Sequence, residues 1–126
     1  MKNTFKLGII LGLLFVCIGA VSAGNYVSVS YDGDYTILTY DNVGNWSWTA
    51  PNGVSNIDYL IVAGGGGGGS NPGTGGPGGG GAGGMLNATN YSVTSGGLYN
   101  ITVGSGGTAT GGSSGTSGTN SSFAGI

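Results

Sequence analysis

The glycine run that begins at Gly64 is the first place where this 126-residue chain could bind a substrate. Gly64, Gly66 and Gly69 satisfy the spacing G-x-G-x-x-G, which in dinucleotide-binding proteins lets backbone N–H groups approach a pyrophosphate. We expect no nucleotide and no other cofactor here. Any uninterrupted glycine run fits that spacing, no helix is predicted after it, and no acidic residue follows Asp58 to hold a ribose. A phosphate-binding P-loop is excluded as well, because it requires a lysine.

The aspartates are the next candidates for chemistry. Asp32, Asp34 and Asp41 carry carboxylate oxygens, which calcium prefers, but the spacing of an EF-hand loop is absent. The chain has no histidine and no glutamate, and its single cysteine and both basic residues lie near the N-terminus. A serine nucleophile would therefore lack a base. We predict no metal site, no catalytic residue and no enzymatic activity, with these aspartates facing solvent in turns.

Trp46 and Trp48 form an aromatic-x-aromatic pair that could stack on a sugar. Side chains two residues apart share one face of a strand, so both rings are expected to point the same way. Aromatic residues at alternate positions more often build a hydrophobic core, and this chain has few other large side chains for one. We therefore favour the core over a sugar-binding site for this pair.

Several asparagines lie in Asn-x-Ser/Thr sequons, the acceptor sites for N-glycosylation in secreted proteins. If the apolar residues of each strand face inward, the alternation of the strand points Asn45, Asn90 and Asn100 outward. We expect a host with an N-glycosylation system to modify some of the sequons. The sequon asparagines are Asn45, Asn87, Asn90, Asn100 and Asn120.

The N-terminus indicates export. Lys2 and Lys6 precede an apolar stretch that ends in small residues at 21–23, which is the pattern of a secretory signal peptide over residues 1–23. We expect this segment to form a helix ahead of the β domain. We favour cleavage over a retained membrane anchor, because the stretch is at the lower limit for crossing roughly 30 Å of hydrocarbon. Cys17 lies inside this segment without the small residue that precedes a lipoprotein cysteine, so we interpret it as a passive apolar residue.

Removal of the signal peptide leaves residues 24–126 without a basic side chain. Nucleic acid is excluded as a partner, since binding to phosphates depends on Lys and Arg. Disulfides are excluded too, because the only cysteine leaves with the signal. Contact with a membrane is expected only through the signal segment, if that segment is not cleaved.

The alternation of apolar and polar residues predicts an all-β scaffold, a small β-sandwich or sheet, within 24–126. YVSVSY and YTILTYD flank a turn at Asp32-Gly33-Asp34, which predicts a β-hairpin. Further strands are predicted at WSWT, at VSNIDYLIVAG and on either side of Gly96-Gly97. The run from Tyr59 to Ala63 is apolar on both faces, which indicates a central strand covered on both sides. No segment after the signal peptide shows a helical period.

Two tracts, residues 64–84 and 104–118, hold many of the 32 glycines. One interpretation is a flexible linker. Ordering glycine is costly, at about 1–2 kcal/mol of backbone entropy per residue with no side chain to bury in return. The other interpretation is that the tracts pack on one another as extended segments with three residues per turn, which glycine permits because it lacks Cβ. We favour packing, because strands flank the tracts and can align them side by side.

The order of these motifs resembles a known family. The stretches WSWTAPNGVSNIDYLIVAGGGGGG, GGGGAGG, LYNITVGSGG and GTNSSFAG follow one another between Trp46 and Gly125. This order is similar to that of the glycine-rich domain of microbial and archaeal surface proteins and phage tail-fibre tips. The resemblance implies a β-sheet scaffold that holds a bundle of poly-glycine helices and serves extracellular display, adhesion or recognition without catalysis. Family members usually continue past Ser-Ser-Phe into another strand and glycine run, so a fragment or a short member is expected.

The expected function is that of a secreted or cell-surface structural and adhesive module, whose rigid glycine-rich scaffold displays loops to a cell-surface or glycan partner. The alternative is a passive, partly disordered extracellular matrix or spacer protein that self-associates through edge strands. A hydrolase that uses a pair of aspartates is a third class, which composition alone does not exclude.

Overall fold

A computed structural model of the chain describes residues 27–70, 76, 78–111 and 114–126. These residues form β-strands and no helix, which confirms the all-β prediction. The signal peptide expected at 1–23 lies outside the described residues. Within the described ranges, no helix has the length and apolar character needed to cross a membrane.

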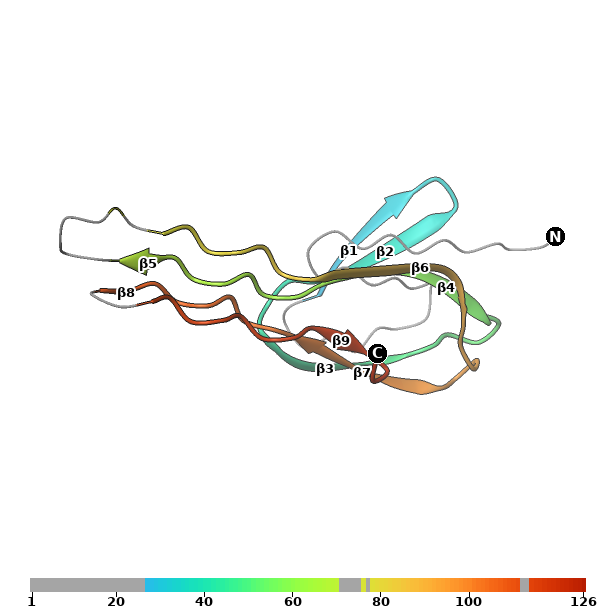
Figure 1. The fold of residues 1–126 in the computed structure, drawn as a ribbon. Helices are drawn as coiled ribbons and strands as arrows, with labels where there is room; N and C mark the ends of the chain where they lie inside the picture. The colour runs from blue at the N-terminus through green and yellow to red at the C-terminus, as the bar shows by residue number, and fades with distance from the viewer. Residues whose placement is uncertain (1–26, 71–75, 77, 112–113) are drawn as a thin grey trace.

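The longer strands form the body of the molecule, and glycine-rich segments project from it with β5 and β8 toward their far end (Figure 1). The pairs β1–β2, β3–β7, β7–β9 and β4–β6 are antiparallel, and β5–β8 is parallel. The strands are β1 (Val27–Asp32), β2 (Tyr35–Tyr40), β3 (Gly44–Thr49), β4 (Asn56–Val62), β5 (Gly69–Ser70), β6 (Met85–Ser92), β7 (Leu98–Val103), β8 (Thr110–Gly111) and β9 (Ser122–Phe123).

The predicted hairpin is present as β1 and β2, which pair in register from Asp32 and Tyr35 at the turn. Gly33 adopts a positive φ of 57° in this turn, a conformation that glycine tolerates without strain. The inward residues of β2, including Leu38 and Tyr40, are buried, whereas most of β1 is exposed. The hairpin therefore packs on the body through β2 and leaves β1 as an outer strand.

The strand predicted at Tyr59–Ala63 is present as β4, but β4 is not a central strand among the described ones. Among the described strands, β4 pairs only with β6, and one face of β4 is buried while Leu60 and Val62 on the other face are half-buried. The glycine segment that continues from β4, residues 63–69, is central instead, because its backbone bonds to three other glycine-rich segments. Apolar residues on both faces gave no signal of where pairing stops and the glycine segment begins.

Phe123 is the centre of the hydrophobic core. It is 3% exposed, and its ring touches aromatic rings from four other strands. The ring centroids lie 5.5 Å from Tyr99, 5.9 Å from Tyr91, 6.0 Å from Tyr59 and 6.2 Å from Trp48. Offset and edge-on aromatic pairs at such distances add to the stabilisation from burial. The short strand β9 thus ties β3, β4, β6 and β7 together.

The turn predicted at Gly96-Gly97 joins β6 to β7. Gly96 has a φ of +74°, and the Gly97 N–H donates to the Thr94 carbonyl over 2.8 Å. The Tyr99 hydroxyl accepts a hydrogen bond from the Thr94 N–H at 2.6 Å. An added Cβ at Gly97 would meet the Thr94 carbonyl oxygen at 2.8 Å and the Tyr99 hydroxyl at 3.2 Å, so this turn requires glycine.

Burial of Tyr40 predicts that the fold loses stability in alkali. Desolvation raises the pKa of Tyr40 from 10.0 to about 12, because the buried site disfavours the charged phenolate. The unfolded chain therefore releases this proton first, and the stabilisation is complete below pH 10.0 and is lost as pH rises toward about 12. We expect the urea midpoint of the wild type to fall over this interval, and to fall less in Tyr40→Phe. An equal fall in both proteins would contradict the assignment.

Candidate functional site

The glycine tracts form a bundle of extended segments: 63–69, 78–84, 104–109 and 114–119 (Figure 1). Segment 63–69 lies in the middle. Every third N–H of this segment donates to segment 78–84, which runs antiparallel to it. These bonds are Ala63 to Gly84 at 2.8 Å, Gly66 to Gly81 at 2.8 Å and Gly69 to Gly78 at 3.0 Å.

The other residues of segment 63–69 bond to different neighbours. The Gly64 and Gly67 N–H groups donate to the Thr119 and Thr116 carbonyls at 3.0 and 2.9 Å. The Gly65 carbonyl accepts from the Gly107 N–H at 2.7 Å. Successive residues therefore face three different segments in turn, which is the three-residue repeat of a polyproline II helix. The structure shows the glycine tracts packed on one another, as the favoured interpretation predicted.

One glycine in each turn is required by the neighbouring backbone. A Cβ added at any of these positions would overlap a carbonyl oxygen of the adjacent segment. Gly78, Gly79, Gly81 and Gly84, by contrast, have nothing within 4 Å of such an atom. The positions of this overlap recur every third residue, and they are Gly64 and Gly67, Gly80 and Gly83, Gly104 and Gly107, and Gly115 and Gly118. In the central segment Gly68 is constrained as well, because a Cβ there would meet the Gly78 carbonyl oxygen at 2.9 Å.

Serine and threonine occupy positions that the repeat leaves open. The Thr119 hydroxyl accepts from the Ser105 N–H at 2.7 Å, and the two side-chain oxygens lie 3.2 Å apart. One turn further along, Thr108 and Thr116 repeat this arrangement with distances of 2.8 and 3.2 Å. These hydroxyls satisfy backbone donors that a glycine neighbour would leave to solvent. Segments 104–109 and 114–119 are thus joined by side chains as well as by backbone.

The sequon asparagines are all exposed. Two of the sequons lie directly opposite each other on β3 and β7, where Asn45 pairs with Thr102 and Ser47 pairs with Asn100. Each asparagine thus faces the hydroxyl residue of the other sequon. The Thr102 hydroxyl donates to Asn45 Oδ1 at 2.9 Å. The exposed sequons are Asn45, Asn87, Asn90, Asn100 and Asn120.

This pairing leads to a prediction about glycan occupancy. Asn45 and Asn100 are diagonal neighbours across two strands, about 7–8 Å apart at Cα, and N-glycans are bulky. In a host that performs N-glycosylation we expect at most one glycan on this pair per chain, and Ser47→Ala should raise the occupancy of Asn100. Mass spectrometry of intact protein and glycopeptides measures both. A main species with both sites occupied would refute the prediction.

The structure places Trp48 and Trp46 on one face of β3, as predicted from their spacing. Trp48 is 4% exposed and packs on Tyr99 and Phe123, and its Nε1 has no hydrogen-bond partner among the described residues. Trp46 is half-buried against the core, and its Nε1 donates to the Asn42 carbonyl at 3.2 Å. The geometry favours the core over sugar stacking for Trp48 and leaves only part of Trp46 open to solvent.

The aspartates do not converge. Asp32, Asp34 and Asp41 are exposed, and no group of acidic, histidine or cysteine residues that could hold a metal ion occurs in the described ranges. Asp58 is buried, and its Oδ1 accepts a hydrogen bond from the Asn90 N–H at 2.6 Å. Asn90 has a φ of +58° at an irregularity in the β4–β6 pairing. Asp58 therefore stabilises a bulge.

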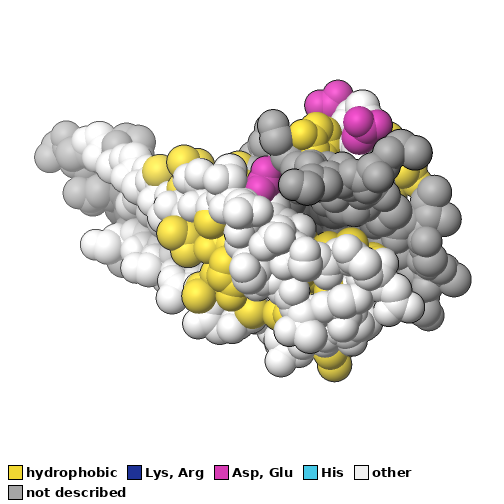
Figure 2. All heavy atoms as spheres, turned by 90° about the vertical axis from the view of Figure 1, so that its right-hand side faces the viewer, with side chains coloured by type: hydrophobic (Ala, Val, Ile, Leu, Met, Phe, Trp, Pro, Cys, Tyr) yellow, Lys and Arg dark blue, Asp and Glu magenta, His cyan; other side chains and the backbone are white. Residues whose placement is uncertain are grey.

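The described residues carry little charge of either sign. Figure 2 shows acidic side chains in only a few places on the face in view, and no basic side chain among the atoms that it describes. The polar groups of the described surface are therefore mainly neutral amides and hydroxyls.

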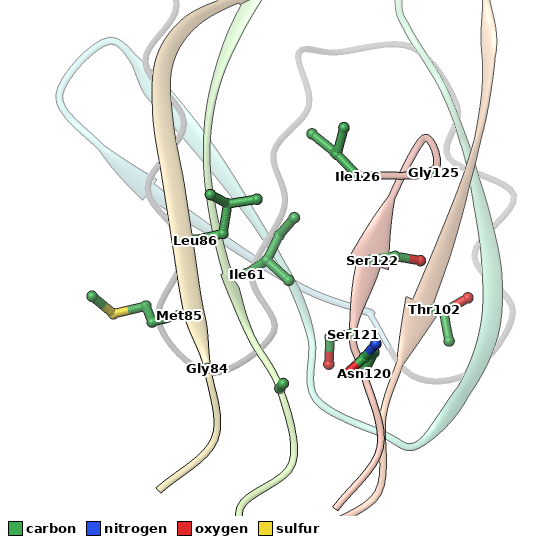
Figure 3. A pocket seen from close by; sticks show the side chains of 11 residues that line it. Ile61, Gly84, Met85, Leu86, Thr102, Asn120, Ser121, Ser122, Gly125 and Ile126 are labelled. Atoms are coloured by element: carbon green, nitrogen blue, oxygen red, sulfur yellow. The ribbon is translucent and has the colours of Figure 1, made fainter.

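Sequence reasoning missed an open groove of about 580 Å³ between β4 and β6 on one side and β7 and β9 on the other (Figure 3). Ile61 and Leu86 contribute apolar side chains, and Thr102, Asn120 and Ser122 contribute polar ones. These residues are far apart in the sequence and meet only because β9 returns beside β7. No local pattern signalled the groove.

The comparison with known families identifies one match. Residues 40–126 match the family described as "Glycine-rich domain". The matched region contains every strand from β3 onward and the glycine bundle, and it leaves β1 and nearly all of β2 outside. No curated protein and no solved structure matches the chain.

Proposed function

This chain belongs to the glycine-rich domain family, and we propose that it is a secreted or cell-surface structural and adhesive module without enzymatic activity. In this proposal the glycine bundle is a rigid arm that projects from the β body and displays loops to a cell-surface or glycan partner. The resemblance of the motif order to surface proteins and phage tail-fibre tips supports an extracellular context.

The observation that carries the proposal is the three-residue repeat of backbone hydrogen bonds in segment 63–69. A linker would gain nothing from a glycine at every third position, whereas a packed bundle cannot form without it. The arm needs no ion, disulfide or charged side chain, because its bonds join neutral backbone groups and hydroxyls. Such an element suits a scaffold better than a catalytic site.

Hydrogen exchange of the full-length protein, followed residue by residue with NMR, tests the scaffold. The Gly66 and Gly67 amides, which donate within the bundle, should exchange much more slowly than Gly79 and Ala82, which donate to no acceptor among the described residues. Equally fast exchange throughout segments 63–69 and 78–84 would overturn the rigid arm. That result would favour the alternative, a passive and partly disordered matrix or spacer protein.

Export and adhesion are tested separately. Intact mass of protein recovered from the culture medium should correspond to loss of residues 1–23, and the full-length mass in the cell pellet would contradict secretion. Immobilised host-cell polysaccharide should retain the purified protein, and the retention should fall in Trp46→Ala, because part of that ring is open to solvent. No retention on polysaccharide would leave the structural role and remove the glycan partner.

A further inference from the structure

The β body is forked where it meets the glycine bundle. At the base of the fork the Gly64 N–H donates to the Thr119 carbonyl over 3.0 Å. Beyond this bond β4 and β9 do not pair: among the described strands, β4 pairs with β6 and β9 with β7. The groove described above lies between these two strands (Figure 3).

β4 directs unpaired backbone groups toward β9. In an antiparallel pair, alternate residues bond to the partner strand. The Ala63 N–H donates to the Gly84 carbonyl, so Ala63 and Ile61 bond on the β6 side. The backbone groups of Leu60 and Val62 therefore point to the opposite edge, where no described residue bonds to them.

The edge of β9 that faces away from β7 is unpaired only at Ser121, which directly precedes the strand. The Ala124 N–H donates to the Asn100 carbonyl over 2.9 Å on the β7 side. By the same alternation, the backbone groups of Ser121 and Phe123 point away from β7. The Phe123 N–H donates to the Ile126 carbonyl at 3.3 Å, and the Phe123 carbonyl accepts from the Ile126 N–H at 3.0 Å. The backbone groups of Ser121 have no partner in the part of the chain that the structure describes.

The lining of the groove favours an uncharged occupant with some apolar side chains. Ile61 and Leu86 point toward the groove from one wall, and Ile126 lies at the other (Figure 3). Leu86 and Ile126 are 48% and 43% exposed, so an occupant would remove apolar surface from water. No lining residue has a charged side chain, so a charged occupant would lose water without gaining a counter-charge.

We propose that this groove binds an extended, uncharged segment of another protein, which adds a β-strand between β4 and β9 and carries apolar residues at alternate positions. Free N–H and C=O groups on both walls favour a polypeptide strand over a sugar or a lipid, as in β-augmentation. A second copy fits less well. Its outer strand β1 is already paired with β2 along one edge, so it could cover only one wall. The proposal rests on the proposed display function and names the class of partner.

A peptide with the sequence LYNITVGSGG, that of residues 98–107, is a suitable probe because it is uncharged and alternates apolar and polar residues before entering glycine. Capped at both ends, it is titrated into the full-length protein while amide exchange is measured by NMR. We expect exchange at Leu60, Val62 and Ser121 to slow by roughly tenfold or more at saturation. A scrambled peptide of the same composition is the ligand control.

Two variants of β6 form a matched pair. Leu86→Arg places a charge in the groove and should weaken peptide binding by roughly tenfold or more. Asn87→Arg places the same charge on the next residue of β6, which is exposed and does not line the groove, and should bind as the wild type does. If Leu86→Arg does not fold, Leu86→Asn replaces it as the groove variant, with a smaller loss expected.

Several results would overturn the proposal. They are no slowing at millimolar peptide, equal binding to both arginine variants, equal binding of the scrambled peptide, and protection of Leu60 and Val62 in the free protein at every concentration. Protection that rises with protein concentration alone would assign the groove to a second copy instead. The Gly66 and Gly67 amides are observed in the same spectra, so loss of the rigid arm and loss of peptide binding are distinguished.

Discussion

Replacement of Phe123 by alanine is expected to lower the free energy of unfolding by about 3–5 kcal/mol, the usual cost of removing a buried aromatic side chain. The ring is 3% exposed and contacts Trp48, Tyr59, Tyr91 and Tyr99. Because these rings come from four strands, the cavity left by alanine would weaken several pairings at once. A domain of this size is stable by only about 5–15 kcal/mol, so the variant would lose a large part of its stability.

Urea denaturation followed by tryptophan fluorescence measures this change, since Trp48 lies beside Phe123 in the core. Leu98→Ala is the matched control: Leu98 is a large apolar residue that is 69% exposed, and its removal should change stability by less than about 0.5 kcal/mol. Phe123→Leu should fall between the two. Similar midpoints for Phe123→Ala and Leu98→Ala would show that β9 does not organise the core.

Alanine at Gly80 is expected to destabilise the bundle strongly, whereas alanine at the next residue is not. A Cβ at Gly80 would overlap the Gly66 carbonyl oxygen, which is backbone and cannot rotate away. Overpacking of this kind costs about 1–3 kcal/mol, and the central segment would have to shift. A Cβ at Gly81 meets nothing within 4 Å, and reduced entropy of the unfolded chain favours Gly81→Ala by about 0.4–1 kcal/mol.

Both variants add one methyl group within the same segment, so their effects on chemical denaturation and on hydrogen exchange can be compared directly. We expect Gly80→Ala to speed exchange at Gly66 and Gly67, and Gly81→Ala to leave it unchanged. Gly83→Ala and Gly84→Ala form a second pair with the same logic, because a Cβ at Gly83 would overlap the Ala63 carbonyl oxygen and one at Gly84 would be free. Equal effects within either pair would contradict the three-residue repeat.

Most of the scaffold could be predicted from local sequence. Alternation and turn residues predicted the β1–β2 hairpin, the β3 strand and the Gly96-Gly97 turn, because each depends on neighbours within a few residues. The packing of the glycine tracts followed from a balance of entropy against contacts that only glycine allows. These features are decided within short stretches of chain.

Features that depend on long-range contacts escaped prediction. Phe123 follows a serine and threonine tract, and nothing near it indicates that four distant rings converge on it. The burial of Asp58 depends on the Asn90 N–H, 32 residues away along the chain. The opposition of Asn45 and Thr102 depends on the register of β3 and β7. Register and chain return are set by the whole fold rather than by a local pattern.

The direction of the bundle's hydrogen bonds has a mechanical consequence. The bonds from Ala63, Gly66 and Gly69 run sideways to segment 78–84, and those from Gly64 and Gly67 run sideways to segment 114–119. A force that pulls the arm along its length would act on all of these bonds in shear, so that they resist together. A force that peels segment 78–84 or segment 114–119 away from segment 63–69 would break them one at a time. The arm is therefore expected to withstand tension along its axis far better than traction across it.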